Sequence, residues 1–113
     1  MNIVEEVIGD LIVEIVTANR ASVKDSEYLK ERLTEKIDQG YKKIIIDLTE
    51  CEFIDSTFLG VLVNTLRKAV KAGGDLKLVG FKPAVKSMFE LTRMFRVFET
   101  YNDLQDAIKS YTQ

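Results

Sequence analysis

The sequence contains no histidine and a single cysteine, Cys51. Without histidine there is no thiol–histidine pair and no ordinary zinc site, since both depend on His or on several Cys side chains. A lone cysteine cannot form an internal disulfide, and without a basic neighbour it is expected to be a small buried residue. These absences exclude many enzyme classes, and we expect neither a metal nor a cofactor.

Long apolar runs and an excess of basic residues are also missing. No apolar stretch approaches the roughly 20 residues that a transmembrane helix needs. The first residues, Met1–Glu6, lack the basic start and apolar segment of a signal peptide. The formal net charge is −2, with Lys and Arg interspersed among Asp and Glu, so no broad positive field favours nucleic acid. We therefore expect a cytoplasmic protein with no membrane partner and no direct nucleic-acid partner.

The residues that are present describe a globular chain. Hydrophobic residues make up 46% of the sequence and charged residues 30%, whereas disordered chains are poorer in apolar residues. A length of 113 residues suits one hydrophobic core but not two. No linker, repeat or low-complexity segment interrupts the pattern. We expect a single domain over residues 1–113.

Three apolar segments predict the first strands. Ile3–Ile8 and Leu11–Val16 are rich in β-branched residues, and Gly9–Asp10 between them supplies turn chemistry, which predicts a hairpin. The continuous apolar run at Lys43–Leu48 is typical of a strand covered on both faces, in the middle of a sheet. Shorter strands are expected at Leu76–Val79 and Val97–Tyr101.

Apolar residues at helical spacing predict helices between these strands. The residues expected to begin them are Ser22 (with Asp25 completing a capping box), Ser56, Pro83 and Asn102. The third helix is expected to bury Val85, Met88, Phe89 and Thr92. A hairpin followed by strand–helix units predicts an α/β fold, with a mixed sheet of about four to five strands packed with about four helices.

The most informative segment is Asp47–Gly60, which reads DLTECEFIDSTFLG and leads from the central strand into the second helix. It resembles the anti-sigma factor antagonist, or STAS, domain, whose signature is an apolar strand ending in Asp, a short loop, and then Phe-Ile-Asp-Ser-Ser/Thr-x-Leu-Gly. The resemblance continues through Gly73–Gly74, Leu76–Gly80, Pro83–Val85 and Thr100–Ile108. It covers nearly the whole chain and implies a STAS fold.

The resemblance also implies a function. In this family the serine after the Asp is phosphorylated by a partner that is both a serine kinase and an anti-sigma factor, and the unphosphorylated form binds that partner and frees the sigma factor. By position the phosphoacceptor is Ser56, flanked by Asp55 and Thr57, which are further candidates for partner contact. A phosphoserine phosphatase is implied as a second partner.

The residue pattern adds expectations about this site. Ser56 is expected at the N-cap, where free backbone N–H groups attract an anion. Phe58, Val61 and Thr65 fall outside the expected core stripe, which consists of Leu59, Leu62, Val63, Leu66 and Val70. Phe58 and Val61 are therefore expected near the surface, as part of a docking patch beside Ser56. Gly60 is expected to let the helix approach a neighbouring element, and Asp47 to be a hydrogen-bonded structural residue.

Three departures from the family pattern bear on these inferences. Ala18–Ser22 replaces a stretch that would carry an acidic residue near the partner surface, so the identity of the partner is open. Phe58 stands where many switch members have Gly, which adds bulk near Ser56. Thr92–Met94 lacks a glycine suited to a helix end.

Two other classes of function are alternatives to this interpretation. A STAS scaffold or sensory module could bind protein partners or a small ligand without a serine switch. An enzyme is disfavoured, because the sequence has no phosphate-binding glycine loop, nucleophile elbow, metal cluster or base–nucleophile pair.

Overall fold

Five strands form one mixed sheet with the order β1-β2-β3-β4-β5 in the computed structural model, which describes residues 2–112. The elements in chain order are β1 (Ile3–Ile8), β2 (Leu11–Val16), α1 (Val23–Asp38), β3 (Lys43–Asp47), α2 (Ser56–Lys71), β4 (Asp75–Val79), α3 (Pro83–Leu91), the short 3-10 helix η1 (Met94–Arg96), β5 (Glu99–Tyr101) and α4 (Leu104–Thr112). The predicted α/β class is confirmed.

The hairpin and the central strand are also confirmed. β1 and β2 pair in antiparallel fashion, with Ile8 opposite Leu11 across the turn, and Gly9 adopts a positive φ of 61° there. β2, β3, β4 and β5 are parallel neighbours. β3 therefore lies in the middle, and Ile44, Ile45 and Ile46 have no exposed surface. This burial on both faces explains why the apolar run of β3 is uninterrupted.

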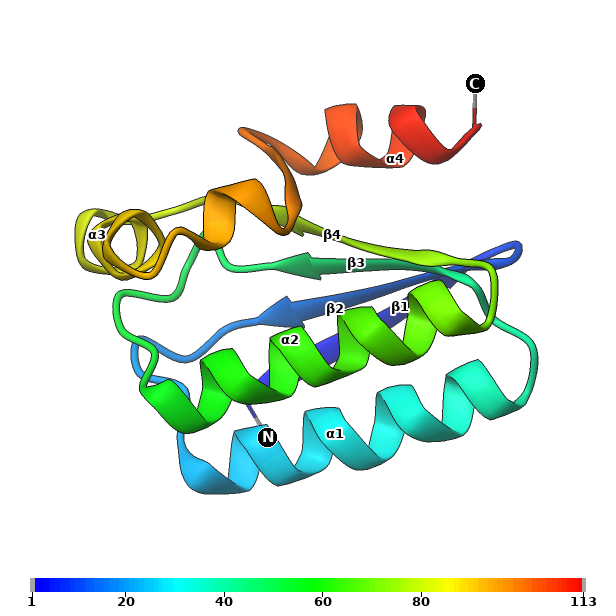
Figure 1. Ribbon diagram of the computed structural model, residues 1–113, viewed down its shortest axis with the longest axis horizontal. Helices are drawn as coiled ribbons and strands as arrows, with labels where there is room; N and C mark the ends of the chain where they lie inside the picture. The colour runs from blue at the N-terminus through cyan, green and yellow to red at the C-terminus, as the bar shows by residue number, and fades with distance from the viewer. Residues whose placement is uncertain (1, 113) are drawn as a thin grey trace.

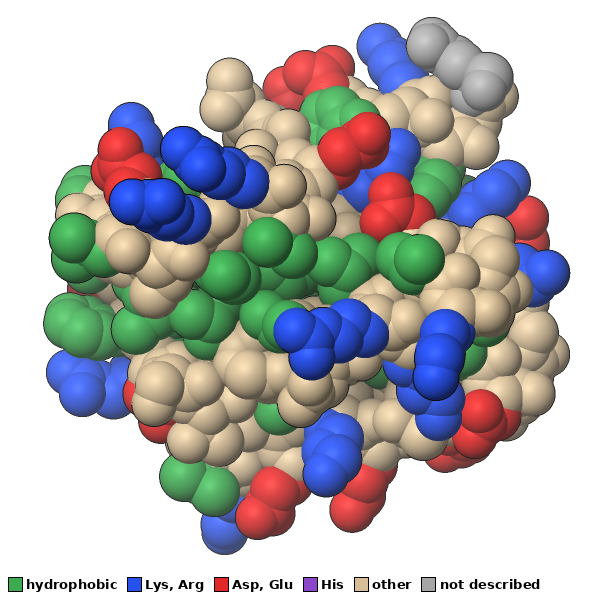
Figure 2. All heavy atoms as spheres, viewed as in Figure 1, with side chains coloured by type: hydrophobic (Ala, Val, Ile, Leu, Met, Phe, Trp, Pro, Cys, Tyr) green, Lys and Arg blue, Asp and Glu red, His purple; other side chains and the backbone are tan. Residues whose placement is uncertain are grey.

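Helices cover both faces of the sheet (Figure 1). α1 and α2 lie side by side against one face, and α4 packs on the opposite face. The larger core includes Ile12, Ile44, Leu33 and Leu62, while a smaller core under α4 includes Ala107. Figure 2 shows that apolar side chains stay visible in a band between α2 and α3, with Lys and Arg on both sides. No helix among residues 2–112 has the length and apolar character needed to cross a membrane.

Local sequence signals explain several helix ends. Ser22 and Asp25 form the expected capping box at α1, and Pro83 occupies the first turn of α3. The prediction for the start of α4 was one residue off, since the Asp103 carboxylate, not Asn102, accepts from the backbone N–H of Asp106 at 2.9 Å. Thr92 is exposed at the C-cap of α3 and is not part of its inner face.

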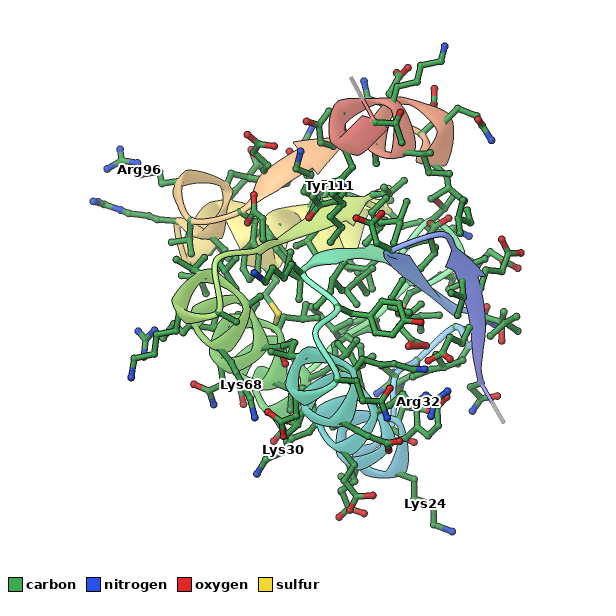
Figure 3. The ribbon with its side chains drawn as sticks, turned by 90° about the vertical axis from the view of Figure 1, so that its right-hand side faces the viewer. Lys24, Lys30, Arg32, Lys68, Arg96 and Tyr111 are labelled. Carbon is green, nitrogen blue, oxygen red and sulfur yellow. The ribbon has the colours of Figure 1, made fainter. Side chains whose placement is uncertain are left out.

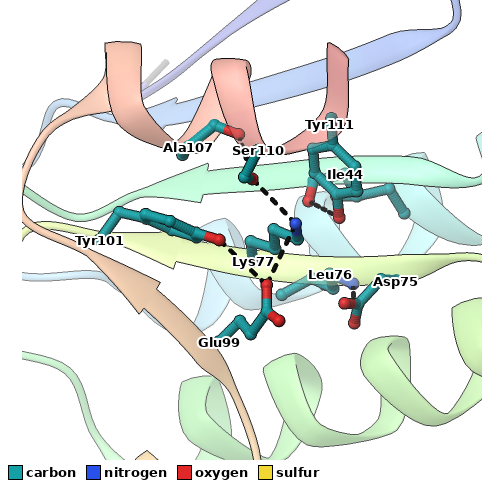
Figure 4. Close-up of polar contacts among 9 residues, drawn as sticks. All are labelled: Ile44, Asp75, Leu76, Lys77, Glu99, Tyr101, Ala107, Ser110 and Tyr111. Atoms are coloured by element: carbon teal, nitrogen blue, oxygen red, sulfur yellow. Dashed lines mark hydrogen bonds and ion pairs between the residues drawn. The ribbon is translucent and has the colours of Figure 1, made fainter. Parts of the chain in front are cut away.

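A buried lysine helps to hold α4 on the sheet (Figure 4). Nζ of Lys77, on β4, donates to Oγ of Ser110 at 2.8 Å and lies 3.1 Å from the Glu99 carboxylate. It also lies 4.1 Å from the ring centroid of Tyr111, whose hydroxyl donates to the carbonyl of Ile44 at 3.0 Å. The Lys77 ammonium thus has a hydrogen-bond acceptor, a carboxylate and an aromatic ring around it, which allows its burial at the helix–sheet interface.

Candidate functional site

The start of α2 places the signature residues one position away from the expected cap. Asp55 is the N-cap, with extended backbone angles, and its Oδ1 accepts from the backbone N–H of Phe58 at 2.8 Å. Ser56 is therefore the first helical residue, and the prediction of Ser56 as the N-cap is wrong. Asp and Ser are both favoured caps, so the sequence alone offered two solutions. Because Asp55 caps the helix, the Ser56 hydroxyl is not used as the cap.

Ser56 and Thr57 are both exposed on the first turn of α2, and Asp55 is exposed beside them. The first backbone N–H groups of a helix have no intrahelical partner, and Asp55 engages only that of Phe58. The N–H groups of Ser56 and Thr57 thus lie at the positive end of the helix dipole. The three residues that the signature predicts to act together are brought together here.

The structure corrects the expected position of Phe58 in the docking patch. Its side chain has no exposed surface and belongs to the main core, so it does not lie near the surface. The buried positions of α2 are Phe58, Leu59, Leu62, Thr65, Leu66 and Ala69, whereas Val70 is 57% exposed. The inner face of α2 is thus rotated relative to the predicted stripe, and Phe58 adds no bulk at the surface beside Ser56.

Val61 lines a groove between α1 and α2 that reaches Ser56. The groove has a volume of about 410 Å³ and is lined by Lys30, Thr34, Ser56, Thr57, Gly60, Val61, Asn64, Thr65 and Lys68. Figure 3 shows Lys30 and Lys68 projecting from the two neighbouring helices. A Cβ at Gly60 would meet no atom of a neighbouring element within 4 Å among residues 2–112, so the expected close approach of another element at Gly60 is not observed there.

Two loops meet at the edge of the sheet before α2. The carbonyl of Asn19 accepts from the N–H groups of Glu52 at 2.7 Å and Phe53 at 2.9 Å, and the N–H of Ala21 donates to the carbonyl of Phe53 at 3.1 Å. Cys51 is buried beneath them, as expected, and burial raises the pKa of its thiol. A buried thiol of raised pKa is not a reactive nucleophile at neutral pH.

Asp47 has the structural role that was expected. It is 9% exposed, and its Oδ1 accepts from the N–H of Thr49 at 2.9 Å and from the Thr49 hydroxyl at 2.6 Å. Gly80 lies against this turn with a positive φ of 74°, and a Cβ there would fall 2.2 Å from the Thr49 Oγ1. The carboxylate fixes the chain direction after β3, where the loop toward α2 begins.

A cluster of ionisable groups under α1 was not predicted from the sequence. Glu14, on β2, is fully buried, and neither of its carboxyl oxygens has a hydrogen-bond partner within residues 2–112. Its cross-strand neighbour Glu5 accepts from Nε of Arg32 at 2.7 Å (Arg32 is labelled in Figure 3). Burial, followed by the adjacent Glu5, raises the pKa of Glu14, whereas Arg32 lowers the pKa of Glu5. The available signal was a lone Glu in an otherwise apolar strand.

Comparisons with known proteins agree with this architecture. The family model of the STAS domain matches residues 5–107. A Thermotoga maritima protein, whose name proposes the role of anti-sigma factor antagonist, is 28% identical over 103 residues, which cover 90% of this chain and 91% of that protein. The anti-sigma-B factor antagonist of Bacillus subtilis is 31% identical over 80 residues, covering 71% and 72% of the two chains.

A solved structure gives the same result. A crystal structure from Thermotoga maritima, whose title proposes an anti-sigma factor antagonist, matches with a TM-score of 0.86 and 26% identity over 98% of this chain and 95% of that one. The match includes the five-stranded sheet and the helices described above. The chain belongs to the STAS domain family, in which its named relatives are anti-sigma factor antagonists.

Proposed function

We propose that this chain is an anti-sigma factor antagonist controlled by phosphorylation of Ser56. The unphosphorylated form binds an anti-sigma factor that is also a serine kinase, and so releases the sigma factor. Phosphorylation of Ser56 by that partner ends binding, and a phosphoserine phosphatase restores it. The observation that carries the proposal is the exposed Ser56 on the first turn of α2, beside an N-cap that is already provided by Asp55.

The position of Ser56 suits a hydroxyl that is modified and restored. Because Asp55 caps the helix, adding a phosphate to Ser56 removes no capping interaction. The N–H groups of the first turn and the helix dipole favour an anion at this place. The phosphorylated chain is therefore expected to keep its fold, so that the switch acts on binding and not on stability.

The effect on binding follows from charge. A phosphate adds about −1.5 to −2 charges at neutral pH, and Asp55 already supplies a negative charge next to it. Burying this combined charge against an apolar or acidic partner surface carries a large desolvation cost. The exposed residues Asp55, Ser56 and Thr57, with the half-buried Val61, form the proposed contact surface, while Phe58 supports it from the core.

The test uses purified anti-sigma factor kinases encoded in the same genome. Each is incubated with this chain and ATP, and digestion with mass spectrometry locates the phosphate. One phosphate on Ser56 is expected, with none on Thr57. Ser56→Ala is expected to abolish the modification and to keep both stability and binding, while the matched variant Thr57→Ala remains a substrate.

Calorimetry then compares the affinity of the kinase for the unmodified chain, the phosphorylated chain and Ser56→Asp. Binding is expected to be strong, greatly weakened and partly weakened, respectively, because one carboxylate carries less charge than a phosphate. Equal affinity for all three forms would contradict the switch and favour a scaffold or sensory module.

A further inference from the structure

We propose that Arg20 and Phe53 form a recognition pair beside the switch, which selects a partner that presents an acidic side chain next to an apolar one. This inference rests on the proposed function, and it specifies the chemistry of the partner surface. Arg20 lies in the loop between β2 and α1, and Phe53 lies in the loop between β3 and α2.

The two side chains are in contact at the surface. Cζ of Arg20 lies over the Phe53 ring, 4.8 Å from its centroid, and Phe53 is 50% exposed. The attraction of a cation to a ring face uses none of the guanidinium N–H donors. The ring therefore holds Arg20 in place without using the donors that would bind a carboxylate. The exposed part of Phe53 also remains open for an apolar contact.

The charge of Arg20 has no partner within the described part of the chain. Among residues 2–112, no carboxylate lies within ion-pair distance of Arg20. The nearby Glu52 pairs instead with Nζ of Lys82 at 3.8 Å. An oriented guanidinium with free donors favours a carboxylate, because the two groups can form paired, charge-assisted hydrogen bonds.

The backbone beneath the pair is fixed. Arg20 and Phe53 form a parallel β-bridge, and the neighbouring hydrogen bonds between Ala21 and Phe53 and between Asn19 and Phe53 tie the two loops together. A surface that is already ordered loses little conformational entropy on binding. Arg and aromatic residues are also enriched among the residues that dominate binding energy.

The pair is also close to the switch. Phe53 is three residues before Ser56, so their Cα atoms are at most about 11 Å apart. The same edge of the sheet carries both loops and the start of α2 (Figure 1). A partner that covers Ser56 is therefore expected to cover the pair as well. Positive charge at Arg20 and negative charge at Asp55 would then define its orientation.

The test measures affinity for the kinase that phosphorylates Ser56, using the full chain. Arg20→Glu is expected to weaken binding at least tenfold, and Arg20→Lys less than Arg20→Gln, because a lysine keeps the charge but not the planar donors. Phe53→Leu is expected to weaken binding by removing the ring that orients Arg20. Arg67→Gln is the matched control, since Arg67 is an exposed arginine of α2, and its affinity is expected to be unchanged.

The outcomes separate this inference from the proposed function. If phosphorylation of Ser56 abolishes binding while Arg20→Glu and Phe53→Leu bind as wild type does, the switch stands and the recognition pair is wrong. If Arg20→Glu loses binding and an acidic-to-lysine change on the partner restores it, the pair is supported. If wild type binds none of the kinases, the proposed function fails and this inference fails with it. Circular dichroism spectra of the variants establish that any loss is not due to unfolding.

Discussion

Glu5 and Glu14 lie directly opposite each other on β1 and β2, yet of these two carboxylates only Glu5 forms an ion pair with Arg32 of α1 within residues 2–112. Glu14 lies deeper, with no exposed surface. Tyr28, Arg32 and Lys36 of α1 are the other titratable groups near the two carboxyls. Burial and the negative charge of Glu5 both favour the protonated form of Glu14. A protonated Glu14 could donate a hydrogen bond to Glu5, which would satisfy both groups.

The first prediction is that stability decreases as pH rises above the ordinary range of a glutamate. The pKa of Glu14 is raised in the folded state, so between the unfolded and folded pKa values folding takes up a proton. Stability then falls by up to about 1.4 kcal/mol per pH unit in that window. Because the chain has no histidine, few other side chains titrate between about pH 5.5 and 8.

Glu14→Gln is expected to remove this slope, because the amide carries no charge and can still donate to Glu5. Urea denaturation at about pH 5.5 and pH 8 compares the two proteins. Glu5 does not contribute to the slope here, because its lowered pKa affects stability only at more acidic pH. An equal pH slope in wild type and Glu14→Gln would show that Glu14 is ionised in the folded state.

The second prediction concerns Phe58 as a core residue. Phe58→Ala is expected to destabilise the fold by about 3 to 5 kcal/mol, because it leaves a cavity in a fully buried site. Val70→Ala on the exposed side of the same helix is the control and is expected to change stability by less than about 0.5 kcal/mol. Chemical denaturation measures the free energy of unfolding of both variants. An unchanged value for Phe58→Ala would contradict the burial of Phe58 and favour its expected position near the surface.

The third prediction concerns the turn after α3. Arg93 has a φ of 60° and is the one non-glycine residue with positive φ among residues 2–112. A left-handed conformation costs a residue with a side chain about 1 to 2 kcal/mol. Replacing that residue with glycine removes this cost, but glycine loses more conformational entropy on folding, which offsets part of the gain in stability. Arg93→Gly is therefore expected to raise stability by about 0.5 to 1 kcal/mol. Thr92→Gly, at a φ of −89°, is the control and is expected to lower stability in thermal unfolding.

The sequence predicted the fold well because its strongest signals are local. Turn chemistry at Gly9–Asp10 and the apolar run at Ile44–Ile46 each had one structural solution, and the missing glycine near Arg93 marked a position that does adopt a positive φ. Errors arose where neighbouring residues compete for the same role. Asp55 and Ser56 are both good caps, as are Asn102 and Asp103, so a shift of one residue changes little in energy.

The site was harder to predict than the fold because it depends on which face of α2 points inward and on contacts between residues that are far apart in the sequence. A shift in the inner face of α2 buries Phe58 and leaves Val70 exposed, although both residues are apolar. The contact of Arg20 with Phe53 joins two loops that are far apart in the sequence, and helical or strand periodicity carries no information about it. Such contacts follow from the sheet register, which brings the ends of β2 and β3 together.

The last prediction separates two contributions of Asp55, the helix cap and the negative charge beside Ser56. Asp55→Asn keeps an oxygen that accepts from the Phe58 N–H, so stability is expected to change by less than about 0.5 kcal/mol. Asp55→Ala removes the cap and is expected to cost about 0.5 to 2 kcal/mol. If the charge contacts the partner, both variants weaken binding equally despite their different stabilities. If Asp55 only positions the first turn, Asp55→Asn binds and is phosphorylated as wild type is, and only Asp55→Ala is impaired. Thermal unfolding with calorimetry on the same samples distinguishes the two roles, and an unchanged stability of Asp55→Ala would contradict the capping geometry itself.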